Sequence, residues 1–150
     1  MKHKRAWIAA AALILLVLVF IWVNSTVSRP VSKAGSQGVL RLLKPILDPI
    51  FGEDRITDQI LRKTAHFLEF FLLGLGLRGL FLLLGQRGFQ GTVNSLFCAL
   101  LAAVADESIQ LLSARGAQVQ DILLDFAGAF AGTLLLWGAY LLLRPGRQRH

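Results

Sequence analysis

The sequence predicts an all-α membrane protein, a polytopic bundle of about four transmembrane helices with an interfacial amphipathic helix as a further element. The first observation behind this prediction is composition: 55% of the 150 residues are hydrophobic and the mean hydropathy is +0.59. A soluble domain of this length would not bury so much apolar surface. The second is that long apolar runs recur along the chain, and no stretch resembles a linker, so residues 1–150 are expected to form one domain.

The first apolar run, residues 6–23, contains no charge and follows a basic N-terminal cluster. At 1.5 Å per residue it is about long enough to cross roughly 30 Å of hydrocarbon. A cleaved signal peptide is the alternative, because small residues follow at Asn24 and Ser25. The run exceeds the usual apolar core of such peptides, about 7 to 15 residues, so we favour a retained anchor.

Residues 64–84, 93–112 and 122–143 form the other three predicted spans. Ionisable residues interrupt them, and such residues are costly at membrane depth unless they have partners. The interrupting residues are His66, Glu69, Arg78, Asp106, Glu107 and Asp125. Arg78 lies toward the inner part of its helix, and we expect its side chain to snorkel to the cytoplasmic headgroups.

Basic residues predict the orientation of the spans. With four alternating spans, one side of the membrane receives Lys2, Lys4, Arg5, Arg87, Arg144, Arg147 and Arg149. The positive-inside rule then makes both termini cytoplasmic and places the loop 24–63 outside. That loop is also basic, but it is longer and contains several acidic residues that temper its charge.

The outer loop contains apolar residues at near-helical spacing between Val39 and Phe51, with charged residues between them. This pattern favours an amphipathic piece lying in the membrane interface. Because Pro45 and Pro49 interrupt it, we expect a short two-part helix or a re-entrant turn. A partly ordered loop is the alternative.

The formal charge of the chain is +7, and many basic residues lie beside apolar spans. The expected partners are therefore anionic lipid headgroups and not nucleic acid. Cys98 is the single cysteine and lies inside an apolar run, so it forms no internal disulfide, and packing is its expected role.

Polar residues gather near the predicted outer end of the second span. Arg62, His66 and Glu69 follow the spacing i, i+4 and i+7, which places them on one stripe of a helix, with Lys63 alongside. The stripe predicts a polar face that meets neighbouring helices.

The third and fourth spans carry matching groups. Asp106 and Glu107 lie one turn from Gln110, and Arg115 follows in the next loop. On the fourth span, one line contains two carboxylates and two glycines, Asp121, Asp125, Gly128 and Gly132. Glycines in such a line allow close approach of another helix.

These groups from three helices fall at the same depth, which predicts a shared ligand site between the helices. The alternative is that they only pair with one another and hold the bundle together. A metal site on His66, Glu69 and the acids is a weaker hypothesis, because the spans hold one histidine and no second such motif; we predict no metal and no cofactor. Covalent catalysis by Ser108 or Ser113 lacks a visible orienting triad.

The same residues resemble the motifs of the VanZ family of bacterial membrane proteins. The resemblance covers about half the chain in family order, as Arg62-Lys63-x-x-His66-Phe67-x-Glu69, Asp106-Glu107-x-x-Gln110, Arg115 and Asp121-x-x-x-Asp125-x-x-Gly128-x-x-x-Gly132. Two positions depart from the family pattern. Phe70 stands where an aromatic with a hydroxyl is common, and Ser113-Ala114 stand where a Pro-Gly turn is usual.

The resemblance implies a multi-pass protein of the bacterial plasma membrane, whose namesake gives low-level teicoplanin resistance without remodelling the peptidoglycan precursor. It brings no established reaction, so we favour a non-enzymatic role. The expected partners are membrane lipids, a lipid-linked wall precursor or the lipoglycopeptide, with Arg62, Lys63 and Arg115 meeting phosphate. The oligomeric state is not predicted.

Two other functions stay open. One is an enzyme that acts on lipid phosphates through His66 as nucleophile or general acid. The remaining histidines, His3 and His150, lie at the cytoplasmic ends, which disfavours a two-histidine mechanism. The other is a structural bundle with internal ion pairs.

Overall fold

The computed structural model describes residues 2–113 and 118–143, which form five helices and contain no strand. The helices are α1 (Lys2–Thr26), α2 (Arg29–Phe51), α3 (Asp58–Leu83), α4 (Phe89–Leu112) and α5 (Val119–Leu143). Four of them, α1, α3, α4 and α5, are long and apolar enough to cross a membrane. This confirms the predicted fold class.

The four long helices begin before the predicted spans, because an apolar run marks the lipid-facing part of a helix and not its ends. The first turn of α3 shows why. The Thr57 side chain caps it by accepting a hydrogen bond from the Ile60 backbone N–H at 3.3 Å, and Asp58 adds a negative charge where the helix dipole favours one. Polar residues thus begin the helix before its apolar segment.

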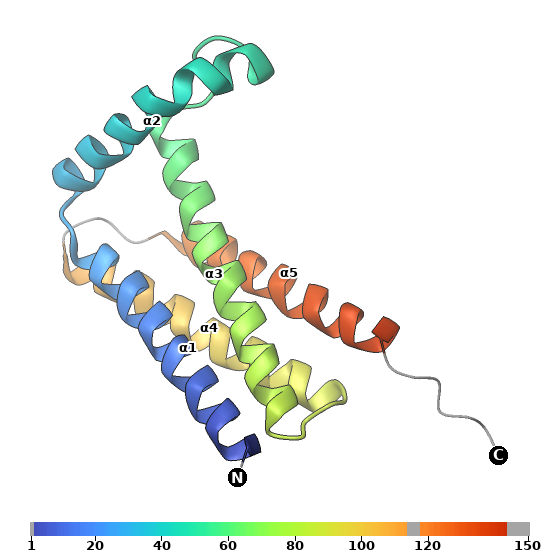
Figure 1. Cartoon of the computed structure of the whole chain (residues 1–150). Coiled ribbons are helices and arrows are strands. Elements are labelled where there is room, and N and C mark those ends of the chain that lie inside the picture. Colours follow the sequence, from blue (N-terminus) through green and yellow to red (C-terminus); the bar gives the residue numbers. More distant parts are fainter. Residues whose placement is uncertain (1, 114–117, 144–150) are drawn as a thin grey trace.

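The helix α3 lies at the centre of the bundle and contacts α1, α4 and α5 as well as α2. Figure 1 shows the N-terminal end of α1 and the α3–α4 connection at one end of the bundle, and α2 at the other. The end of the bundle nearer α2, where α1 and α4 finish and α5 begins, is the one that contains the polar residues described below.

Glycines bring α3 and α5 into direct backbone contact. A Cβ on Gly132 would overlap the carbonyl oxygen of Phe71, and one on Gly74 would overlap that of Ala129. The Thr133 hydroxyl also donates to the Gly74 carbonyl at 3.3 Å. Because lipid gives little hydrophobic drive between helices, such close packing is a main source of stability in a membrane bundle.

The helix α2 is continuous from Arg29 to Phe51, so the predicted two-part helix or re-entrant turn is wrong. Pro45 and Pro49 lie in its last two turns and four residues apart, which puts the hydrogen bonds they remove on one face and leaves the rest of the ladder intact. The helix ends at Gly52, whose φ of +97° suits glycine and whose N–H donates to Asp48 O at 2.9 Å.

One face of α2 is an exposed apolar stripe. Among the described helices α2 contacts only α3, and Leu42, Ile46 and Ile50 keep 78%, 62% and 68% of their surface exposed. The polar side includes Lys44, which pairs with Asp54 Oδ1 at 2.7 Å, and this carboxylate raises the pKa of Lys44. The helix therefore has the form expected of an interfacial segment.

Arg78 differs from its prediction. Its side chain is fully buried and donates to the carbonyl oxygens of Gln86 and Arg87 at 3.0 and 3.1 Å. Snorkelling to the headgroups is therefore the wrong description, because the α3–α4 connection folds back over the guanidinium. Arg78 satisfies backbone acceptors that follow the end of α3.

Candidate functional site

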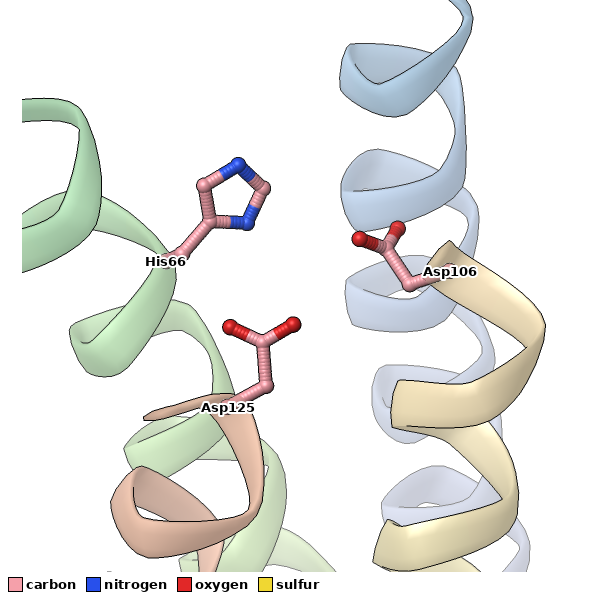
Figure 2. A group of neighbouring side chains, drawn as sticks. All are labelled: His66, Asp106 and Asp125. Atoms are coloured by element: carbon pink, nitrogen blue, oxygen red, sulfur yellow. The ribbon is translucent and has the colours of Figure 1, made fainter. Parts of the chain in front are cut away.

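Three ionisable side chains meet where α3, α4 and α5 come together. One ligand atom each of His66, Asp106 and Asp125 lies within 4.8 Å of the others. Figure 2 shows the imidazole and both carboxylates pointing into the same space. Asp106 and Asp125 are almost completely buried, with 0% and 1% of their surface exposed, and His66 is partly buried. We call these three residues the central triad.

Asp106 is held by hydrogen bonds at both carboxylate oxygens. The Ser25 hydroxyl of α1 donates to Oδ1 at 2.5 Å, and the Gln110 side chain, one turn along α4, donates to Oδ2 at 2.8 Å. Ser25 is itself fully buried. Two donors fix the orientation of this carboxylate and offset part of the free energy of burying its charge.

The Asp125 carboxylate, unlike that of Asp106, has an oxygen without a hydrogen bond in the described part of the chain. Its Oδ2 atom is buried and has no hydrogen-bond partner among the described residues. A buried carboxylate without a partner is unfavourable by several kcal/mol, unless a proton or a cation compensates it. The position of Asp125 beside His66 and Asp106 therefore marks the centre of the cluster as a place for positive charge.

Glu69 extends the triad by one turn of α3. Its Oε2 lies 3.7 Å from His66 Nδ1, and its Oε1 accepts a hydrogen bond from the Asn24 side chain of α1 at 3.4 Å. Through Asn24 and Ser25 the first helix thus contacts carboxylates of both α3 and α4.

A second group of charges lies at the rim, beyond the triad. Lys63 Nζ lies 3.0 Å from Asp121 Oδ1, which joins α3 to the first turn of α5. Glu107 accepts a hydrogen bond from the backbone N–H of Gln118. Arg62 is partly buried, and its Nε has no hydrogen-bond partner in the described part of the chain.

The sequence-predicted residues fall into three groups in the structure. His66, Glu69, Asp106, Gln110 and Asp125 form the centre, and Arg62, Lys63, Glu107 and Asp121 form the rim. Gly128 and Gly132 follow Asp125 along α5 and lie at the close crossing of α3 and α5, against the backbone of Phe67 and Phe71. Arg115 lies outside the described residues.

Sequence reasoning missed Asn24 and Ser25. Both lie at the end of the first apolar run, where small residues are also typical of a cleavage site. Their position carried usable information, because the predicted outer end of the first span falls at the same depth as the predicted acids. A polar pair at that depth is a candidate partner for buried carboxylates.

The charges suggest a negative centre with basic residues at the rim. Among the described residues, no Lys or Arg forms an ion pair with Glu69, Asp106 or Asp125. The centre therefore suits a cation, and the two basic rim residues suit an anion that arrives from the bundle end.

The comparisons with known proteins agree with the residue pattern. The model of the VanZ/LLP1 family matches residues 10–143. This range includes nearly all of the four candidate membrane spans and every residue of the centre and the rim. No curated protein and no solved structure matches the chain.

Proposed function

The chain belongs to the VanZ/LLP1 family, and from this premise we propose that it binds a phosphate-bearing lipid headgroup at the extracytoplasmic side of a bacterial plasma membrane. The headgroup belongs to a membrane lipid or to a lipid-linked cell-wall precursor. The observation that carries the proposal is the meeting of ionisable side chains from α3, α4 and α5 at one end of a membrane bundle. Ionisable residues inside transmembrane segments are costly and are usually retained for function.

The distribution of charge supports the proposed orientation. Arg5 near the N-terminus and Arg87 in the α3–α4 connection lie at the end of the bundle opposite the triad. Positive residues favour the cytoplasmic side, so the triad and α2 face the outer leaflet in this proposal. The apolar stripe of α2 then rests at the same membrane surface from which a lipid headgroup enters.

The rim residues supply the chemistry for phosphate. Arg62 carries a planar guanidinium whose Nε lacks a partner within the described chain, and such a group binds phosphate in a bidentate manner. Lys63 is held in place by Asp121, which reduces the entropy that the ammonium loses on binding. The carboxylates of the centre accept hydrogen bonds from hydroxyl or amino groups of the same headgroup.

Native mass spectrometry of the protein in lipid nanodiscs tests this proposal. We expect the wild-type protein to retain phosphatidylglycerol or undecaprenyl phosphate in preference to neutral diacylglycerol. Arg62→Gln should remove most of that preference. The matched control Arg55→Gln, which changes an exposed arginine in the α2–α3 connection, should retain it. Equal preference in the wild type and Arg62→Gln contradicts the proposal.

Headgroup binding at this depth also links the protein to teicoplanin tolerance. The acyl chain of a lipoglycopeptide anchors in the outer leaflet, where the proposed site lies. A protein that binds lipids or the anchor there changes the surroundings of the drug without changing its peptide target. We therefore include teicoplanin tolerance in the proposed function.

One contact favours a second candidate, an enzyme acting on lipid phosphates. His66 Nδ1 lies 3.7 Å from Glu69 Oε2, and a carboxylate beside an imidazole is a common arrangement for proton transfer. Turnover of polyprenyl and glycerolipid phosphates by the purified protein distinguishes the two functions. Phosphate release that is lost in His66→Ala supports the enzyme, and binding without turnover supports the receptor.

A further inference from the structure

We propose that His66, Asp106 and Asp125 bind one divalent first-row transition-metal ion. This inference goes beyond the proposed function, since it needs no lipid. Their ligand atoms lie within 4.8 Å of one another and come from three different helices. Ligands of such ions lie roughly 2.0–2.2 Å from the metal, so donors round one ion are separated by roughly 3 to 4.4 Å. Small side-chain rotations bring the three donors into that range.

An independent observation points to a ligand at the same place. Asp125 is 1% exposed, and its Oδ2 has no hydrogen-bond partner among the described residues. Figure 2 shows its carboxylate directed toward the space between His66 and Asp106. In a structural network most buried polar atoms have a hydrogen-bond partner, whereas a metal ion would use an unpartnered carboxylate oxygen directly.

The net charge of the centre supports a cation of charge two. Asp106, Asp125 and Glu69 lie close together, and within the described residues none of them pairs with Lys or Arg. Glu69 Oε2 is buried and has no hydrogen-bond partner among the described residues, and it lies 3.7 Å from His66 Nδ1. It is thus placed either to enter the coordination shell or to orient the imidazole.

The surroundings of Asp106 resemble the outer shell of a metal site. Ser25 and Gln110 donate to its two carboxylate oxygens, and each oxygen keeps a further lone pair for a metal. Such partners orient ligands before the metal arrives, and their loss usually lowers metal affinity about 10- to 100-fold. Ser25 also makes the site depend on the correct packing of α1.

The donor set indicates the class of metal. One imidazole nitrogen and two carboxylate oxygens suit Zn²⁺, Mn²⁺ or Co²⁺, whereas Mg²⁺ and Ca²⁺ prefer oxygen alone. Three protein ligands leave coordination positions open, as in sites where a metal binds a further ligand. A phosphate oxygen that enters past the rim would meet such a position. The sequence-based expectation of no metal rested on the single histidine in the spans, and the folded arrangement supplies the two aspartates that complete the set.

The test uses the full-length protein without an affinity tag, reconstituted in nanodiscs and stripped of metal with a chelator. Titration with Co²⁺, followed by visible absorption, should give one equivalent per chain, and Zn²⁺ should displace it. Elemental analysis after dialysis against Zn²⁺ should give the same stoichiometry. Asp125→Asn and His66→Gln should each lower the affinity by at least about 100-fold, and Ser25→Ala by about 10- to 100-fold.

The matched control is Asp121→Asn, which changes a carboxylate one turn away on the same helix. Asp121 pairs with Lys63 at the rim and is not one of the three proposed ligands, so this variant should lose far less metal affinity than Asp125→Asn. Thermal melts of each apo-protein confirm that the variants are folded. Absence of the one-equivalent site in the wild type overturns the proposal. Unchanged metal affinity in folded Asp125→Asn overturns it as well. So does a loss of affinity in Asp121→Asn as large as that in Asp125→Asn, because metal binding would then depend on the overall negative charge and not on three specific ligands.

Discussion

The Ser25 hydroxyl donates to Asp106 Oδ1 at 2.5 Å, joining α1 to α4 across 81 positions of the sequence. Both residues are fully buried. The hydrogen bond therefore ties the first span to the carboxylate at the centre of the polar cluster. Lipid offers no water to replace a lost hydrogen-bond donor. Removing the Ser25 hydroxyl is therefore expected to lower the stability of the whole bundle.

Ser25→Ala should lower the stability of the protein. Removing one partner of a buried charged group costs about 1–3 kcal/mol, and Asp106 would keep only the donor from Gln110. Thermal unfolding in nanodiscs should show a clear fall in the midpoint. Thr26→Ala is the control, since the exposed Thr26 hydroxyl donates to Val23 O of its own helix. Equal effects of the two substitutions would show that the contact with Asp106 contributes nothing.

Gly132→Ala should destabilise the contact between α3 and α5. A Cβ at this position overlaps the carbonyl oxygen of Phe71, so the two helices must move apart. At Gly138 a Cβ has no neighbour within 4 Å, and Gly138→Ala should be neutral or stabilising by up to about 1 kcal/mol through helix propensity. Unfolding measurements on both variants compare the same chemical change at a close and an open position. Similar midpoints would contradict the close crossing.

The membrane orientation is tested by labelling single cysteines in a Cys98→Ala background. Ser36→Cys in α2 should react with an impermeant thiol reagent in intact cells, and Arg87→Cys in the α3–α4 connection should react only after permeabilisation. The wild-type arginine at residue 87 favours the cytoplasmic side for this connection. The opposite labelling pattern would place the polar cluster at the inner leaflet and would contradict the proposed function.

The apolar face of α2 should lie in the membrane interface. In the same Cys98→Ala background, a polarity-sensitive fluorophore on Leu42→Cys should be quenched by brominated lipids. The fluorophore on Gln37→Cys, at an exposed position on the opposite side of the helix, should stay accessible to an aqueous quencher. If each quencher reduces the fluorescence at residues 42 and 37 to the same extent, the apolar stripe of α2 does not face the membrane.

Much of the fold could be predicted because membrane spans are set by local composition. The apolar run 6–23 contains no charge, and a helix is the structure that satisfies its backbone in lipid without a partner. The continuity of α2 was missed for a related reason. The prediction of a break considers only the hydrogen bonds that Pro45 and Pro49 remove. It leaves out the four turns of intact helix before them, which keep α2 continuous.

The candidate site was predictable in depth but not in its contacts. The spacing of His66 and Glu69 places both on one helix face, and the alternation of spans brings Asp106 and Asp125 to the same end of the bundle. The sequence does not state which faces of the helices meet. The contact of Ser25 with Asp106 depends on the packing of α1 against α3 and α4, a tertiary property without a local pattern.

Family membership and the location of the polar cluster together predict an effect on teicoplanin tolerance. Expression in a susceptible Gram-positive host should raise tolerance to teicoplanin far more than to vancomycin, as measured by minimum inhibitory concentrations. The two drugs bind the same peptide terminus, but teicoplanin carries an acyl chain that anchors in the outer leaflet. If the protein binds lipids or the acyl anchor, tolerance to teicoplanin alone should rise, whereas an altered peptidoglycan precursor should raise tolerance to both drugs. An equal rise for both drugs would therefore exclude the anchor mechanism.

The same measurement tests the cluster itself. Tolerance should be lost in His66→Ala, Glu69→Gln and Arg115→Ala variants that accumulate normally in the membrane. The first two remove groups of the centre, and the third removes an arginine of the sequence motif. Ser108→Ala is the control, since its exposed hydroxyl donates to Val104 O within its own helix α4, and it should keep full tolerance. Tolerance retained in all three cluster variants would separate the polar residues from the mechanism. Without any change in tolerance to either drug, the family membership would reflect a shared scaffold whose function has diverged.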